Sequence, residues 1–263
     1  MTPRQPPLWL LPALLVTASV PVLARQAPDT PALAPPPTDR LNERWWADRH
    51  RAILATIAEH RDPAVVLIGD SIINNYDKAA PPDENFAPTW ARYYAPRRAL
   101  NLGFSGDTTA NVLWRLQHGE VDGLHPKAVV VLIGTNDTAG AGRTAMQTEA
   151  GIDAVVGDLK RRLPDTKILL LGLLPSAITP AKSATDAAVN AYLAERYAAD
   201  PRVAYRDIGA IFRRPDGTLD ETLFYDPRLP QHGKPLHPDT KGQQMMAEAI
   251  KPTLANLLGE QPL

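Results

Sequence analysis

Four short segments, far apart in this chain, carry residue types that together could cleave an ester. The first offers a hydroxyl nucleophile, the second and third offer N–H groups that would stabilise an oxyanion, and the fourth offers a base. In chain order they are Gly69-Asp70-Ser71, Gly103, Gly134-Thr135-Asn136-Asp137 and Leu236-His237-Pro238.

Ser71 is the candidate nucleophile. It follows the apolar run 65–68, which is typical of a strand buried on both faces. Most serines cap helices or form turns, but the position after a buried strand, within Gly-Asp-Ser, favours a catalytic role. We expect Asp70 and Asp137 to be structural, with Asp70 bracing its loop by hydrogen bonding.

Gly103 and Asn136 are the candidate oxyanion donors. A glycine lets its N–H approach a substrate oxygen with no side chain in the way, although a lone glycine more often serves a simple turn. In the segment after Gly103 we expect Ser105 or Asp107 to cap a helix. Asn136 ends the strongest predicted strand and would point its amide into the same crevice, its alternative role being an Asx turn.

His237 is the candidate base among six histidines. Pro238 restrains the backbone around it, which favours a fixed imidazole. His232, in the same proline-rich loop, is the only rival. The other four are expected at the surface or in packing roles: His50, His60, His118 and His125.

A catalytic imidazole needs a partner that fixes its tautomer, usually a carboxylate. Lys234, three residues before His237, has no acceptor and would disfavour the imidazolium. Asp226 is the preferred partner, because the loop after it holds three prolines and can fold back toward His237. Asp239 is a weaker candidate, being too close in sequence to reach the far ring nitrogen easily, and a backbone carbonyl is the third.

Helical and strand patterns alternate along the chain. We expect helices over 41–60, 107–118, 146–163, 183–199 and 240–258, and strands over 64–68, 98–102, 128–133, 167–171 and 203–205. We expect the first helix to bury Trp45, Ile53, Leu54 and Ile57, and Thr240 to cap the last.

This alternation predicts an α/β fold with a doubly wound parallel sheet covered by helices on both faces. Ligands bind such sheets at the carboxyl ends of the strands. Ser71, Gly103 and Asn136 each follow a predicted strand, so all three should lie at the same edge.

The composition and the N-terminal segment limit the classes of function and the cellular location that we expect. A net charge of −1 gives no indication of nucleic-acid binding, and the absence of cysteine excludes disulfides and a thiol nucleophile. Residues 1–24 resemble a cleavable signal peptide, so we expect no stable membrane insertion and a periplasmic or secreted protein. Residues 25–38 read as a proline-rich linker, and residues 39–263 as the catalytic domain.

Taken in order, the segments resemble the sequence blocks of the SGNH, or GDSL, hydrolase family. Within it the chain is most like the platelet-activating-factor acetylhydrolase catalytic subunits and related lysophospholipase-like esterases. The resemblance rests on Ser105-Gly106-Asp107-Thr108-Thr109, Val112-Leu113-Trp114-Arg115-Leu116, Gly134-Thr135-Asn136 and Gly172-Leu173-Leu174-Pro175.

The resemblance implies a three-layer, flavodoxin-like sheet of about five strands and hydrolysis through an acyl-enzyme, with neither metal nor cofactor. By the same match the oxyanion hole consists of the backbone N–H of Ser71, the N–H of Gly103 and the side chain of Asn136, with His237 as base. The family's Asp-x-x-His pattern is broken here by Lys234.

The resulting hypothesis is an exported serine esterase for short acyl esters, acetyl above all. One alternative, motivated by Lys234, is a glycan- or lipid-binding protein that has lost the chemistry. Another is an acyltransferase that uses a sugar hydroxyl in place of water. The sequence leaves open whether the alcohol is an O-acetylated carbohydrate, a lysophospholipid or a small ester, and whether the chain forms a homodimer.

Overall fold

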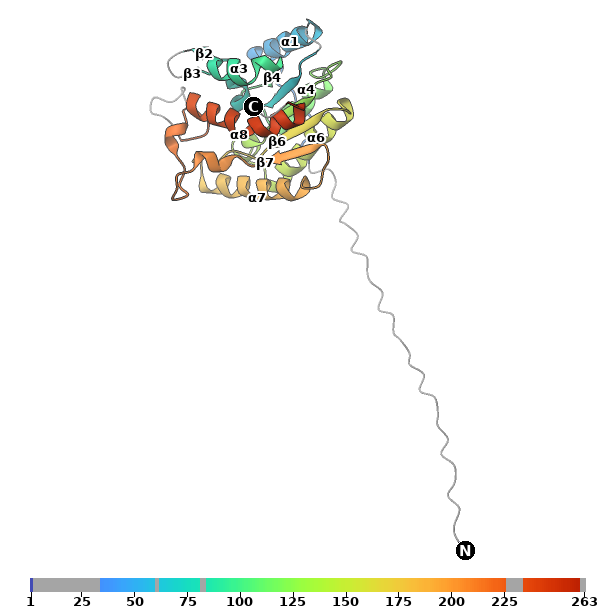
Figure 1. Cartoon of the computed structure of the whole chain (residues 1–263), viewed down its shortest axis with the longest axis vertical. Helices are drawn as coiled ribbons and strands as arrows, with labels where there is room; N and C mark the ends of the chain where they lie inside the picture. Colours follow the sequence, from blue (N-terminus) through green and yellow to red (C-terminus); the bar gives the residue numbers. More distant parts are fainter. Residues whose placement is uncertain (2–33, 60–61, 81–83, 226–233, 261–263) are drawn as a thin grey trace. The chain divides into compact units, whose positions relative to one another are not determined.

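The computed structural model describes Met1 and residues 34–59, 62–80, 84–225 and 234–260. Five parallel strands form the central sheet in the order β4-β1-β5-β6-β7 (Figure 1). They are β1 (Val65–Gly69), β4 (Leu100–Gly103), β5 (Ala128–Leu132), β6 (Lys167–Leu171) and β7 (Val203–Arg206). This order is that of a flavodoxin-like sheet, so the predicted fold class is confirmed.

The helices are α1 (Arg44–Glu59), α2 (Ser71–Asn74), α3 (Ala87–Tyr93), α4 (Thr109–Gln117), α5 (Thr135–Thr138), α6 (Ala145–Arg162), α7 (Pro180–Arg196) and α8 (Thr240–Leu258). Short 3-10 turns are η1 (Asn75–Asp77), η2 (Ala95–Arg97), η3 (Gly209–Phe212) and η4 (Glu221–Leu223), and β2 (Ala79–Ala80) pairs with β3 (Glu84–Asn85). The predicted long helices and all five strands are present. The short helices α2, α3 and α5 and the β2–β3 pair were not predicted.

Two apolar layers, one on each face of the sheet, hold the fold together. Successive side chains of a strand point to opposite faces, so in β1 Val66 and Ile68 join one core cluster, while Val65 and Leu67 join the other. The first cluster is covered by α1, α4, α6 and α7, and the second by α2, α3 and α8. Both faces of the sheet are therefore buried, as its continuous apolar strands require.

Several predicted details were wrong at helix ends and faces. Trp46, fully buried, faces the core instead of Trp45, which is 42% exposed. Helix α7 begins three residues early, because Thr179 caps it and Pro180 occupies its first turn. Thr108 caps α4 in place of Ser105 or Asp107, and Asp239 caps α8 in place of Thr240.

A buried ionic cluster underlies the segment between β4 and α4. The Asp107 carboxylate, fully buried, accepts hydrogen bonds from Arg115 Nε (2.8 Å), Trp46 Nε1 (2.8 Å) and Arg40 Nη1 (3.0 Å). Arg115 also donates to buried Glu120, whose other oxygen contacts His50. Every charge in this cluster has a charged partner, which is the condition for burying charges at tolerable cost.

The predicted signal peptide and most of the predicted linker lie outside the described residues, so both remain predictions. Within the described segments, no helix combines the length and apolar character needed to cross a membrane.

Replacing Arg115 with Met should lower the free energy of unfolding by about 3–5 kcal/mol, because it leaves Glu120 buried without its arginine partner and Asp107 paired with Arg40 alone. Urea denaturation monitored by circular dichroism measures this loss. Arg51→Met is the matched control, because Arg51 pairs with Asp48 at the exposed surface and should matter by less than about 1 kcal/mol. Equal effects of the two substitutions would contradict the assigned role of the cluster.

Candidate active site

Ser71 and His237 meet at the carboxyl edge of the sheet. The Ser71 Oγ lies 2.8 Å from His237 Nε2, and both residues are about 8% exposed. The 166 residues between them are bridged by the fold alone. With Nε2 unprotonated, the imidazole accepts the serine proton, which is the arrangement that activates a hydroxyl nucleophile.

Helix α2 fixes the position of Ser71, its first residue. On the β4 side, Asn101 Nδ2 donates to the Ile73 carbonyl at 3.0 Å. On the α8 side, Gln243 Nε2 donates to the Ile72 carbonyl at 2.7 Å. Two buried amides therefore hold this single turn from opposite sides, and the Ser71 N–H at its start has no acceptor within the helix.

The segment 237–239 is held by backbone pairing with the segment 223–225. Tyr225 N donates to the His237 carbonyl at 2.8 Å, Asp239 N donates to the Leu223 carbonyl at 2.8 Å, and Phe224 bridges Pro238. Tyr225, the residue before Asp226, therefore lies beside His237.

These contacts narrow the choice of residue that could orient the His237 imidazole. Asp226 and His232 lie outside the described residues, so the preference for Asp226 remains a prediction. The Asp239 carboxylate accepts a hydrogen bond from Gly242 N at 2.6 Å as the cap of α8. Lys234 is exposed and donates to the Ile178 carbonyl at 2.8 Å, so its amine is held by a different loop.

Gly103 does not provide a free oxyanion donor, contrary to the prediction. Its N–H donates to Asn101 Oδ1 at 2.9 Å. A Cβ at this position would lie 2.3 Å from Asn74 N, so the glycine is required for close packing of β4 against α2. Gly103 therefore ends strand β4 in a packing role.

Gly106 is a candidate donor that the sequence prediction did not name. Its φ of +79° is a conformation that favours glycine, and no described residue accepts a hydrogen bond from its N–H. Its place next to Asp107 brings it close to Asn136, as the contact below shows. A second glycine in the same segment, directly before the predicted helix, was the available signal.

Asn136 lies in α5, just past β5, as predicted. Its side-chain Nδ2 donates to the Asp107 carbonyl at 2.8 Å, which leaves the second N–H of the amide for another acceptor. Asp137 is structural, also as predicted: it is fully buried and accepts hydrogen bonds from Thr109 N (3.0 Å) and Thr109 Oγ1 (2.7 Å).

Asp70 braces the nucleophile loop. One carboxyl oxygen accepts a hydrogen bond from Ile72 N at 2.9 Å, and the other, Oδ2, is buried without a partner in the described structure. Burial raises the pKa of Asp70 to about 7, with Asp107 and Asp137 adding to the rise and Lys182 opposing it. A group that changes charge near neutral pH therefore adjoins Ser71.

Together these groups have the geometry for acyl transfer: a hydroxyl with its base, an unused N–H at the start of a helix turn, and an amide anchored by the adjoining loop. Attack on an ester carbonyl would place negative charge beside the N–H groups, where donors fixed in advance stabilise it most. The structure therefore brings Ser71 and His237 into contact, joins Asn136 to the segment after β4, and shows the Gly103 N–H engaged elsewhere.

Known proteins are similar to this chain in sequence and in fold. The GDSL-like lipase/acylhydrolase family model matches residues 67–245. Human platelet-activating factor acetylhydrolase IB subunit alpha1 is 32% identical over 235 residues, covering 88% of this chain and 93% of that protein. The Gallus gallus alpha2 subunit is 32% identical over 199 residues, or 74% and 81% of the two chains.

A solved GDSL-like lipase from Bacteroides thetaiotaomicron shares the fold, with a TM-score of 0.57 at 19% identity over 80% of this chain and 97% of that one.

Asp70→Asn should flatten the dependence of stability on pH. The folded-state pKa of Asp70 lies above its ordinary value, so the stability that its protonation contributes is present below about pH 4 and is lost as the pH rises to about 7. The loss amounts to about 1.4 kcal/mol per pH unit in that window, and Asn, which retains an acceptor for Ile72 N, cannot show it.

Urea unfolding at pH 5, 6, 7 and 8 tests this difference. Asp216→Asn, at an exposed carboxylate whose pKa is lowered by hydrogen bonds from Thr218, should keep the parental slope in this range. Identical slopes for the parent and Asp70→Asn would contradict the assignment.

Proposed function

Because this chain belongs to the GDSL-like lipase/acylhydrolase family, we propose that it is an exported serine esterase that hydrolyses short-chain acyl esters, acetyl esters above all. The observation that carries the proposal is the 2.8 Å contact between Ser71 Oγ and His237 Nε2. Relatives named acetylhydrolases support the acetyl preference, and the apolar N-terminal segment with its cleavage-like site supports export.

In the first half-reaction, the Ser71 hydroxyl passes its proton to His237 Nε2 while its oxygen bonds to the ester carbonyl carbon. The carbonyl electrons move onto oxygen, giving a tetrahedral oxyanion. We assign the Ser71 N–H, the Gly106 N–H and the free amide N–H of Asn136 to that oxygen. Collapse breaks the bond to the alcohol, which leaves with the proton from His237.

In the second half-reaction, water gives a proton to His237 and attacks the acyl carbon. The second oxyanion collapses, the carboxylic acid departs, and Ser71 recovers its proton. The ester and one water molecule balance these steps, because each proton that His237 takes is returned within the same half-reaction.

We assign the orientation of His237 to Asp226. The support is the backbone hydrogen bond from Tyr225 N to the His237 carbonyl, because Tyr225 directly precedes Asp226 in the chain. Asp239 is disfavoured because its carboxylate caps α8, and Lys234 because it is an exposed cation held by the Ile178 carbonyl.

Ser71→Ala should abolish hydrolysis of p-nitrophenyl acetate, because it removes the nucleophile while leaving the fold intact. Asn136→Ala should lower kcat by about 10²–10³-fold, as the loss of one oxyanion donor does. Steady-state kinetics on the mature protein measures both, with Ser105→Ala as a hydroxyl control outside the proton-transfer path. Turnover by Ser71→Ala at the parental rate would exclude the mechanism.

Asp226→Asn should slow kcat by up to about 10⁴-fold, as loss of the orienting carboxylate does in serine triads. Asp239→Asn should cost far less in kcat, because the amide oxygen can still accept from Gly242 N. Comparing the two kcat values, with unfolding curves to exclude a loss of structure, tests the assignment. Small and equal effects would point to a Ser–His dyad oriented by a backbone carbonyl.

A further inference from the structure

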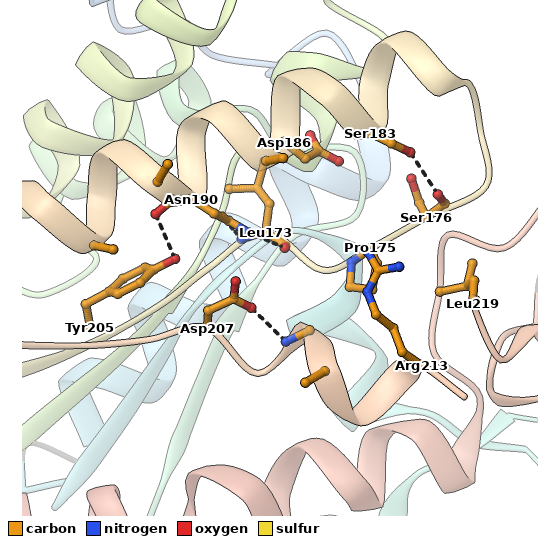
Figure 2. Close-up of a pocket in the computed structure, with 15 residues that line it drawn as sticks. Leu173, Pro175, Ser176, Ser183, Asp186, Asn190, Tyr205, Asp207, Arg213 and Leu219 are labelled. Carbon is orange, nitrogen blue, oxygen red and sulfur yellow. Dashed lines mark hydrogen bonds between the residues drawn. The ribbon is translucent and has the colours of Figure 1, made fainter. Parts of the chain in front are cut away.

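A cavity of about 740 Å³ lies at the same carboxyl edge of the sheet as the Ser71–His237 pair, beyond the ends of β6 and β7 (Figure 2). Its walls come from the β6–α7 loop, one side of α7, and the segment after β7. Neither Ser71 nor His237 lines it. The volume is in the range of cavities that bind small organic ligands.

Its distance from the nucleophile follows from the strand order. Strands β6 and β7 are the second and third neighbours of β1. At about 4.8 Å per strand, the cavity is about 10–15 Å from Ser71 along the edge. A substrate whose scissile ester lies at Ser71 could therefore place a distant part of its alcohol group here.

The walls combine polar and apolar side chains, and their charged residues are of both signs. Asp207 has one oxygen engaged with Gly209 N and the other open, and Arg213 uses only Nη1, on the Gly217 carbonyl, among its described contacts. The Ser176 hydroxyl is buried without a hydrogen-bond partner in the described structure. Asp186 is neutralised by Lys182 at 2.6 Å.

This mixture favours a neutral group that both donates and accepts hydrogen bonds. Phosphate is disfavoured, because Arg213 is the only basic residue among the described residues of the walls and shares them with two carboxylates. A quaternary ammonium is disfavoured, because such cations prefer several aromatic faces and the described walls supply only Tyr205. The hydroxyls of a sugar match the open carboxylate and guanidinium, and its C–H faces match Pro175 and the alanines of α7.

Two hydrogen-bonded connections join this cavity to the catalytic groups. The β6–α7 loop, which forms one wall, is held by Ala177 N to the Pro235 carbonyl (2.9 Å) and by Lys234 to Ile178, both on the segment that leads to His237. On the other wall, Asp186 accepts from Thr138 Oγ1 at 2.6 Å, at the end of the helix that carries Asn136.

We propose that this cavity is a carbohydrate subsite, which takes a sugar unit of the alcohol part of the substrate and so makes the enzyme an esterase of acylated glycans. The proposal rests on the proposed ester hydrolysis. It also gives Lys234 a role, since its bond to Ile178 fixes the wall of the subsite against the histidine segment.

The kinetic test uses a substitution that fills the cavity. Ala187→Trp places an indole at an exposed, lining position of α7, and Ala188→Trp does the same at an exposed neighbour outside the cavity. Ala187→Trp should lower kcat/KM for acetylated xylotriose at least about tenfold, because binding of a remote part of the substrate is lost, while p-nitrophenyl acetate hydrolysis stays within about twofold. Ala188→Trp should alter neither. Equal effects of Ala187→Trp on both substrates would overturn the proposal.

The binding test is independent of turnover. Saturation-transfer NMR on the Ser71→Ala protein with xylotriose, cellotriose, mannotriose and chitotriose should detect at least one ligand, and adding Ala187→Trp should abolish its signal. No bound sugar, or binding of glycerophosphocholine alone at the Ala187 site, would overturn the carbohydrate assignment. Failure of the parent protein to hydrolyse p-nitrophenyl acetate would instead refute the esterase proposal. The NMR experiment would still test whether the cavity binds a sugar.

Discussion

The active site depends on the buried ion pair between Asp107 and Arg115. The Asp107 carboxylate is tied to Arg115, Trp46 and Arg40 in the core, while its backbone carbonyl receives the Asn136 amide. A single residue thus joins the core of the protein to the candidate oxyanion hole. Because an unpaired charge is so unfavourable in this environment, the segment that carries Gly106 has few other positions to adopt.

The site also includes a buried carboxyl group, Asp70, whose burial lowers the stability of the folded protein. Asp70 is completely buried beside the nucleophile, with one oxygen unpartnered in the described structure. Its hydrogen bond to Ile72 N fixes the turn that presents Ser71. Local instability of this kind is common where a site must hold a fixed geometry, and it is tolerated because the two large apolar layers supply stability elsewhere.

The sequence was sufficient for the features that depend on periodicity and local order. Continuous apolar runs such as 128–132 predicted the strands, and the serine, asparagine and histidine that follow or flank them predicted most of the site. Helices α2 and α5 are only four residues long, too short for a 3.6-residue period to appear. Gly103 was predicted as the donor instead of Gly106, because the Asn101 side chain that occupies the Gly103 N–H takes its direction from the fold. Trp45 was predicted as the buried tryptophan in place of Trp46, because an error of one residue rotates the helical face by 100°.

The departure at Lys234 is the clearest case of a long-range cause. In a sequence, a cation three residues before the base reads as a damaged catalytic pattern. In the fold, that side chain extends to the carbonyl of Ile178, 56 residues away in the chain. The backbone pairing of 223–225 with 237–239 brings a different part of the chain beside the imidazole. A partner for His237 supplied through this pairing would not need position 234, which leaves the lysine free to join the histidine segment to the loop after β6.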